Sequence, residues 1–174
     1  MDPQLLHRVD EGVATIVIHH PVKRNAITAR MWQALPPLLD KLAADPQVRA
    51  LVLTGEGGTF SAGADISSLR AFQPAAGAAL GPRAAPGERV AGPQEFAVAA
   101  QDALTAFPWP TLAAVRGHCV GGGCQLAAAC DLRFADETAI FGVTAAKLGV
   151  VYPPSATRRL VDLVGPAATK YLLF

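Results

Sequence analysis

Three β-branched or aliphatic segments, each followed by a helical pattern, constrain the fold of this 174-residue chain most strongly. The predicted buried strands are Val13–His20, Val48–Thr54 and Thr111–Val120. The helical patterns between and after them are 28–42, Pro93–Phe107 and 121–130. Strand and helix patterns that alternate in this way are typical of an α/β core, and we expect one domain over residues 1–174.

The first helical pattern begins at Thr28, whose side chain suits an N-cap. Its apolar stripe contains Pro36 and Pro37, and an interior proline costs about 3 kcal/mol. We therefore expect a kink or a break at this pair. Later in the chain, short strands are predicted near Leu132–Phe134 and Ala139–Gly142.

Near the C-terminus, Ser155–Val164 is predicted as a helix with Gly165 as its cap, and Pro166 begins a further helix. The final residues, Tyr171, Leu172, Leu173 and Phe174, are apolar and fall inside that helix. We expect them to need a covering layer that this chain does not supply. A partner would cover them, or the sequence is a shortened form of something longer.

Residues 71–92 differ from the rest of the chain, because they are mostly Ala, Gly and Pro and show no period. Patterns of the earlier type resume after them, so this segment is predicted to be a mobile insertion rather than a linker between domains.

The overall composition excludes several classes of protein. The chain is 51% hydrophobic and 17% charged, with a net charge of +1. It can therefore bury a core, and it has no strong field for nucleic acid or anionic lipid. No apolar run approaches the roughly 20 residues that span a bilayer, and the N-terminus lacks a signal pattern. We predict a cytoplasmic protein that binds neither nucleic acid nor membrane, with Cys119, Cys124 and Cys130 reduced and no metal site.

Glycines stand between a strand and a helix at two places, 55–58 and 121–123. The first is one glycine short of a dinucleotide-binding fingerprint, since Phe60 occupies the third glycine position. The sequence contains neither a phosphate-binding P-loop motif nor a G-x-S-x-G nucleophile elbow. These absences argue against a nucleotide-binding protein and against a serine hydrolase.

The second glycine turn, Gly121–Gly123, opens a helix whose first N–H groups are free to bind an oxygen atom. Another turn of small residues, Ser61–Asp65, precedes a short helix predicted at Ala64–Leu69. Close packing of strand and helix would explain either turn alone. Together, two turns that each donate one backbone N–H can form an oxyanion hole.

Three segments give the chain a recognisable likeness. The stretch VRALVLTGEGGTFSAGADISSL resembles the first signature of the enoyl-CoA hydratase/isomerase (crotonase) superfamily. The stretch from Thr111 to Gly165, with HCVGGGCQLAAACD at its centre, resembles the second signature and the family's segment beyond it. HPVKRNAIT is similar to the family's N-A-L segment. The resemblance implies a crotonase-like spiral of ββα repeats, with the C-terminal covering and trimerisation helices missing.

The resemblance also assigns functions to residues. It places the oxyanion hole on the backbone N–H groups of Ala64 and Gly122. The contacts expected for coenzyme A fall on Lys23, Arg24, Asn25, Ala26, Ile27, Ala62, Asp65, Ile66 and Ser67. The resemblance implies an acyl-CoA thioester as substrate, in fatty-acid or branched-acid metabolism, without a separate cofactor because coenzyme A is part of the substrate. It further implies a homotrimer or a dimer of trimers.

The sequence departs from the family at both glutamates that hydratases use. Gln125 and Ala145 occupy those positions, and neither side chain can transfer a proton as a carboxylate does. Efficient hydration is therefore not expected. Tyr152 matches a tyrosine of methylmalonyl-CoA decarboxylase-like members, so one alternative is a decarboxylase-type enzyme. A second is a protein that binds acyl-CoA without catalysis.

Overall fold

The computed structural model of the chain describes residues 2–65, 67, 93–143 and 152–174. Its main sheet has five strands in the order β1-β2-β3-β4-β6, and a second sheet pairs β5 with β7. The strands are β1 (Gln4–Asp10), β2 (Val13–His19), β3 (Ala50–Gly55), β4 (Thr111–Val115), β5 (His118–Val120), β6 (Leu132–Ala135) and β7 (Ile140–Gly142). The helices are η1 (Pro21–Lys23), α1 (Ala29–Ala43), α3 (Pro93–Thr105), α4 (Gly122–Ala129) and α5 (Pro154–Leu173).

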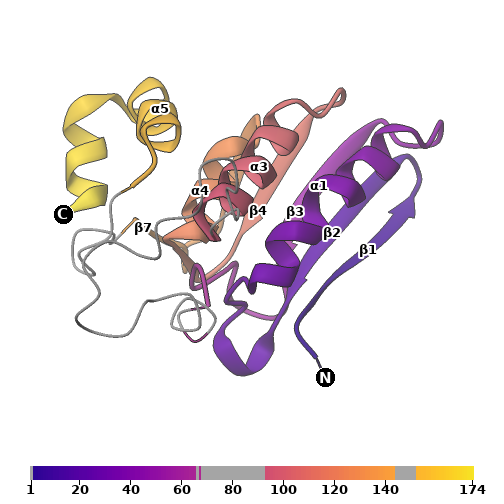
Figure 1. The fold of residues 1–174 in the computed structure, drawn as a ribbon, viewed down its shortest axis with the longest axis horizontal. Helices are drawn as coiled ribbons and strands as arrows, with labels where there is room; N and C mark the ends of the chain where they lie inside the picture. The colour runs from indigo at the N-terminus through magenta and orange to yellow at the C-terminus, as the bar shows by residue number, and fades with distance from the viewer. Residues whose placement is uncertain (1, 66, 68–92, 144–151) are drawn as a thin grey trace, which may run out of the picture.

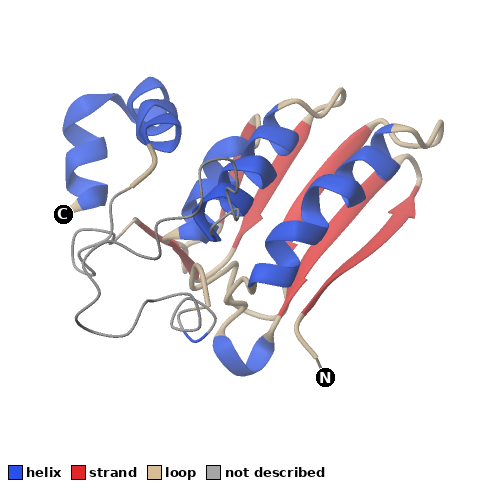
Figure 2. Cartoon of the chain, in the orientation of Figure 1, coloured by secondary structure: helices blue, strands red, loops and turns tan. Residues whose placement is uncertain are grey.

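The main sheet is parallel from β2 to β6, and helices connect its parallel strands. The helices α1, α3 and α4 lie side by side against the sheet, whereas α5 stands at the end of the molecule beside β7 (Figures 1 and 2). This arrangement confirms the predicted α/β fold. The core between the sheet and the helices is mostly aliphatic, and its buried aromatic side chains among the described residues are Trp32, Phe60 and Phe107.

The strand β1 was not predicted. It forms an antiparallel hairpin with β2, through a turn in which Glu11 and Gly12 have φ angles of 47° and 85°. Two residues of positive φ are what a tight hairpin turn between twisted strands requires. Most side chains of β1 are exposed and only Leu5 and Val9 pack against the core, so the apolar pattern of this strand is weak.

Helix α1 begins as the sequence predicts, since the Thr28 hydroxyl accepts a hydrogen bond from the Met31 N–H. Of the kink or break expected at Pro36 and Pro37, the break is wrong, because one helix runs from Ala29 to Ala43. The buried stripe is Met31, Trp32, Leu35, Leu39 and Leu42. Its burial against the sheet offsets the hydrogen bonds that the two prolines cannot donate.

The strand predicted at Thr111–Val120 is two strands in two different sheets. Gly117 separates them, with a φ of 51° that turns the chain. A Cβ atom at this position would collide with the carbonyl oxygen of Gly58, so the first glycine turn packs directly on the corner. This contact joins residues far apart in the sequence, which is why the local pattern reads as one continuous strand.

Helix α5 contains the interruption that the sequence indicates at Gly165, whose φ and ψ are 76° and 168°. Beyond it, Leu172 and Leu173 are not left uncovered as expected. Both pack against the core, and the Leu172 carbonyl accepts a hydrogen bond from the Val143 N–H. Tyr171 and Phe174 do remain exposed, at 87% and 77%. The expectation of an uncovered end is therefore wrong for the two leucines and correct for the aromatic residues.

The predicted insertion at residues 71–92 lies outside the described residues. The three cysteines are free thiols in the buried core, as the sequence analysis expected. None of the helices in the described ranges is long and apolar enough to cross a membrane.

Candidate functional site

The segment after β3 lies between two other parts of the chain. Isolated parallel bridges connect Ile27 with Ala64 and Ser61 with Cys119. On one side the Ile27 N–H donates to the Gly63 carbonyl over 2.7 Å. On the other side the Ser61 N–H donates to the His118 carbonyl over 2.8 Å. The turn at 61–65 is thus held against both the 24–27 loop and β5.

The glycines of this turn and of α4 bring two backbones into direct contact. A Cβ atom on Gly63 would lie 2.9 Å from the Val120 oxygen and 3.3 Å from the Gly122 nitrogen. A Cβ atom on Gly122 would lie 2.8 Å from the Trp32 ring and 3.5 Å from the Ala64 nitrogen. Only residues without a side chain allow this approach. The Ala64 and Gly122 amides are consequently neighbours.

Both of these amides have a free donor. The bridge to Ile27 uses the Gly63 carbonyl and the Asp65 N–H, so the Ala64 N–H is left over. Gly122 is the first residue of α4, where the helix offers no acceptor. Across the described residues, neither N–H donates to a protein oxygen. Two unpaired donors beside the positive end of a helix can bind an oxygen atom that carries negative charge.

Ala64 itself is extended, and the helix expected to begin there does not include it. Most of the rest of that predicted helix, with Ile66, lies outside the described residues. Ala145 does too. The donor of Ala64 is therefore freed by a strand-like bridge and not by a helix start.

Asn25 stabilises the loop in front of the site. Its amide donates to the carbonyls of Glu56 and Thr59 over 2.9 and 2.7 Å, and its oxygen accepts from the His20 N–H over 3.0 Å. The residue is 1% exposed, with a φ of 57°. Its carbonyl also accepts from the Ser61 hydroxyl. The Asn25 side chain is thus used inside the protein, where it cannot reach a ligand.

The two predicted basic residues differ. The Lys23 ammonium lies 2.9 Å from both Asp65 carboxylate oxygens and donates to the Ser67 hydroxyl over 2.6 Å. Burial works to raise the pKa of Asp65, but hydrogen bonds from Lys23 and Ser67 outweigh it and hold that pKa below its ordinary value. Arg24 is exposed and has no ion pair among the described residues. Of the two cations, Arg24 is the one left for an anionic ligand.

Gln125 lies one helical turn beyond Gly122 and is 8% exposed. Its Oε1 accepts a hydrogen bond of 3.2 Å from Nε2 of Gln101. The hydroxyl of Tyr152 is buried beside it and has no hydrogen-bond partner among the described residues. Burial and the neighbouring Cys124 raise the pKa of Tyr152 above its ordinary value. Gln125 partly offsets this shift, although the two groups do not meet in hydrogen-bond geometry.

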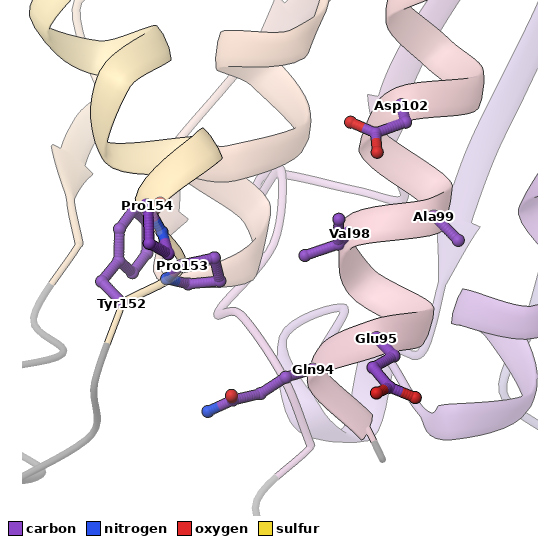
Figure 3. A pocket seen from close by; sticks show the side chains of 8 residues that line it. All are labelled: Gln94, Glu95, Val98, Ala99, Asp102, Tyr152, Pro153 and Pro154. Atoms are coloured by element: carbon purple, nitrogen blue, oxygen red, sulfur yellow. The ribbon is translucent and has the colours of Figure 1, made fainter. Parts of the chain in front are cut away.

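A pocket of about 440 Å³ opens between α3 and the start of α5 (Figure 3). Tyr152 and Pro153 lie across it from Val98. Its lining residues are Gln94, Glu95, Val98, Ala99, Asp102, Tyr152, Pro153 and Pro154. Tyr152 lines this pocket and lies beside Gln125, which follows Gly122 by one helical turn.

The structure brings together four of the predicted residues, Ala64, Gly122, Gln125 and Tyr152. Of the expected coenzyme A contacts, Ala26 and Ile27 are buried beside the bridge, while Ala62 and Ser67 are exposed. Gln101, a polar residue on the buried stripe of α3, was not predicted from the sequence. Its position between Ala97 and Leu104 at helical spacing was the available signal.

Comparison with known proteins points to the same family. The model of the enoyl-CoA hydratase/isomerase family matches residues 8–174. A Mycobacterium tuberculosis protein named "Probable enoyl-CoA hydratase EchA14" is 38% identical over 172 residues, which is 99% of this chain and 62% of the relative. The short-chain-enoyl-CoA hydratase of Clostridium acetobutylicum is 32% identical over 163 residues, 93% of this chain and 58% of the relative.

Among solved structures, a crystal structure of an enoyl-CoA hydratase/isomerase family member superposes with a TM-score of 0.84 at 38% identity. The superposition covers 99% of this chain and 62% of the other. The chain thus spans about three fifths of the length of the proteins it matches.

Proposed function

Because the chain belongs to the enoyl-CoA hydratase/isomerase family, we propose that it binds an acyl-CoA thioester and stabilises the enolate of that thioester. The observation that carries this proposal is the pair of unpaired N–H groups on Ala64 and Gly122. Both belong to backbone that the surrounding glycines and bridges hold in place. Such donors need little reorganisation when charge develops on an oxygen between them.

In this mechanism the thioester oxygen lies about 3 Å from both nitrogens. The two hydrogen bonds, together with the positive end of α4, strengthen as the carbonyl becomes an enolate. Trp32 packs under Gly122 and keeps the start of α4 from shifting toward the core. The energy gained is therefore specific to the charged state of the substrate.

Coenzyme A is assigned to the loops on the open side of the two amides. Arg24 supplies the exposed cation for its phosphates. The Lys23–Asp65 ion pair fixes the loop that carries Arg24, and the pantetheine arm is assigned to the exposed residues Ala62 and Ser67 beside it. No separate cofactor is part of this proposal.

Two-carboxylate hydration is not expected, because Gln125 and Ala145 stand at the two glutamate positions. One observation favours a decarboxylase-type reaction as a second candidate. The buried Tyr152 hydroxyl has no partner among the described residues, so it is available to a substrate. Loss of CO₂ generates an enolate without a base, and the two amides would stabilise it. A protein that binds acyl-CoA without turnover is the remaining alternative.

Several apolar side chains in the C-terminal half are exposed, and exposed apolar surface of this kind is typical of a protein–protein interface. They are Leu132, Phe134, Ile140, Leu163, Val164, Tyr171 and Phe174. We assign this surface to contacts between copies of the chain, in a trimer or a dimer of trimers. Light scattering would test it, and a monodisperse monomer with a melting temperature independent of concentration would contradict it.

The central experiment is carbon-13 NMR of acetyl-CoA labelled at the thioester carbonyl. Binding in a pair of amides polarises the carbonyl, so its resonance should move downfield in the complex. The shift should be lost with Gly122→Ala. Binding without any shift would contradict the oxyanion hole. Assays with crotonyl-CoA and methylmalonyl-CoA would then separate hydration, decarboxylation and binding alone.

A further inference from the structure

A series of hydrogen bonds leads from Arg159 of α5 through Gln101 to Gln125. The Arg159 guanidinium donates to Oε1 of Gln101 over 3.2 Å. Nε2 of Gln101 donates to the Ala97 carbonyl over 2.8 Å and to Oε1 of Gln125 over 3.2 Å. Gln101 is 1% exposed, so its polar atoms depend on these partners.

The donor and the acceptor in each of these hydrogen bonds can be assigned from the groups that take part. Arginine can only donate, so the atom of Gln101 that faces Arg159 is the oxygen. A backbone carbonyl can only accept, so the atom that faces Ala97 is the nitrogen. Gln101 therefore also presents N–H to Gln125, which must accept through its oxygen. The amide orientation of Gln125 is fixed through its neighbour.

Gln125 is consequently left with its NH₂ group turned away from Gln101. No hydrogen bond from that group is found within the described part of the chain, although Gln125 lies near enough to the Tyr152 hydroxyl to lower the pKa of that hydroxyl. The Tyr152 hydroxyl is a buried group without a hydrogen-bond partner among the described residues. A hydroxyl without an acceptor leaves a donor unsatisfied in a site where water has little access.

We propose that the Gln125 NH₂ group and the Tyr152 hydroxyl form a donor pair that binds an oxygen atom on the acyl group of the substrate. Gln101 and Arg159 act as positioning residues for this pair. The inference rests on the proposed binding of an acyl-CoA thioester. It adds the substrate class, which is a thioester whose acyl group carries an oxygen acceptor.

The position of that oxygen is set by the helix. Gln125 lies three residues after Gly122, which corresponds to about 5 Å along α4. An oxygen on the β-carbon of the acyl group, or a carboxylate on its α-carbon, is at a suitable distance when the thioester oxygen lies between the two amides. Both groups accept hydrogen bonds through an oxygen atom, and they differ in their charge.

Isothermal titration with three thioesters tests the proposal. Acetoacetyl-CoA offers a ketone, malonyl-CoA a carboxylate, and butyryl-CoA no acceptor. We expect at least one oxygenated thioester to bind about tenfold more tightly than butyryl-CoA, as one or two added hydrogen bonds allow. Whichever of the two binds more tightly identifies the source of the oxygen.

Variants of Gln101 distinguish two roles for this residue, orienting the Gln125 amide or only stabilising the fold. Gln101→Glu keeps an acceptor for Arg159 but has no N–H for Gln125, so the Gln125 amide should turn and offer its oxygen to the site. The preference for an oxygenated thioester should then disappear, while butyryl-CoA still binds. Gln101→Met, which fixes neither orientation, should reduce the preference less.

Two adjacent arginines of α5 provide a matched control. Arg159→Met should reduce the preference, because Arg159 holds Gln101. Arg158→Met should not, since the Arg158 side chain is 85% exposed and pairs only with Asp162 within the described residues. Equal binding of all three thioesters, or a preference unchanged in every Gln101 and Arg159 variant, would overturn this inference and leave the proposed function standing. Failure of all three to bind would overturn both.

Discussion

The two sides of the candidate site use different kinds of hydrogen-bond donor. Around Ala64 and Gly122 the site consists of backbone, and glycines and bridges determine where the donors point. Around Gln125 and Tyr152 it consists of side chains on α4 and before α5, with donors that depend on neighbouring side chains. We call these the backbone side and the side-chain side.

This difference indicates on which side of the site a single substitution can change the hydrogen-bond donors. A donor on the backbone side is lost only when its backbone moves, so most substitutions there act by steric collision. A donor on the side-chain side is lost or reversed by one substitution that leaves the fold intact. Under the proposed function, both donor turns are kept while Gln125 and Ala145 stand where the family resemblance implies carboxylates.

The largest effect is expected for Gly122→Ala. The new Cβ would lie 2.8 Å from the Trp32 ring and 3.5 Å from the Ala64 nitrogen, so the start of α4 must shift. Loss of one oxyanion donor costs about 10²–10³-fold in turnover. Turnover, or the carbonyl NMR shift where turnover is absent, provides the measurement. Gly58→Ala is the control, since nothing lies within 4 Å of its Cβ position. Equal effects of both substitutions would contradict the special role of the backbone side.

The second prediction concerns the side-chain side. Gln125→Glu alone should bring little hydration of crotonyl-CoA, because the partner position remains Ala145. The double variant Gln125→Glu with Ala145→Glu should exceed it by about 10²-fold, since acid–base groups that act as a unit are not additive. Substantial hydration by the native chain that survives Tyr152→Phe and Gln125→Ala would show that the chemistry lies elsewhere.

Asn25→Ala should lower the free energy of unfolding by about 2 kcal/mol, because it removes the three hydrogen bonds that the side chain of this buried residue makes in the loop on the backbone side. Denaturant unfolding measures this change. The neighbouring Arg24 has nearly the same backbone conformation, with a φ of 50°, but is exposed. Arg24→Ala therefore controls for the cost of the left-handed conformation. A similar loss in both variants would assign the effect to the backbone instead of the side chain.

The smallest effect is expected for Tyr152→Phe, which should raise the free energy of unfolding by about 1 kcal/mol near neutral pH. It removes a buried hydroxyl that has no partner among the described residues. The raised pKa adds a pH dependence. Above about pH 10 the unfolded chain releases the Tyr152 proton and the folded protein retains it, so native stability falls by at most about 1.4 kcal/mol per pH unit. Tyr152→Phe should remove that share of the slope, and an unchanged slope would contradict this prediction.

Local sequence patterns predicted those features of the fold that depend on residues close together in the sequence. The cap at Thr28 and the interruption at Gly165 arise from single residues with one dominant conformational use. The division at Gly117 could not be read in this way, because the reason for it is the Gly58 carbonyl. The cover over Leu172 likewise depends on a distant strand.

The candidate site was predictable to a similar degree. The two glycine turns indicated paired backbone donors, and the resemblance named Ala64 and Gly122 as their source. The contact between Gln101 and Arg159 joins residues 58 positions apart and leaves no mark in local periodicity. The sequence pattern also did not show that Asn25 would use its side-chain amide inside the loop.

The proline pair of α1 bears on the order in which the chain folds. Pro36 and Pro37 cannot donate to the carbonyls of Trp32 and Gln33, and each lowers intrinsic helix stability by about 3 kcal/mol. Residues 29–43 should therefore have little helix in the unfolded ensemble. We expect α1 to form only as its apolar stripe docks on β2 and β3, so that amide protection in α1 develops together with that of the sheet. The platform that Trp32 provides beneath Gly122 is then completed late, after the strands have paired.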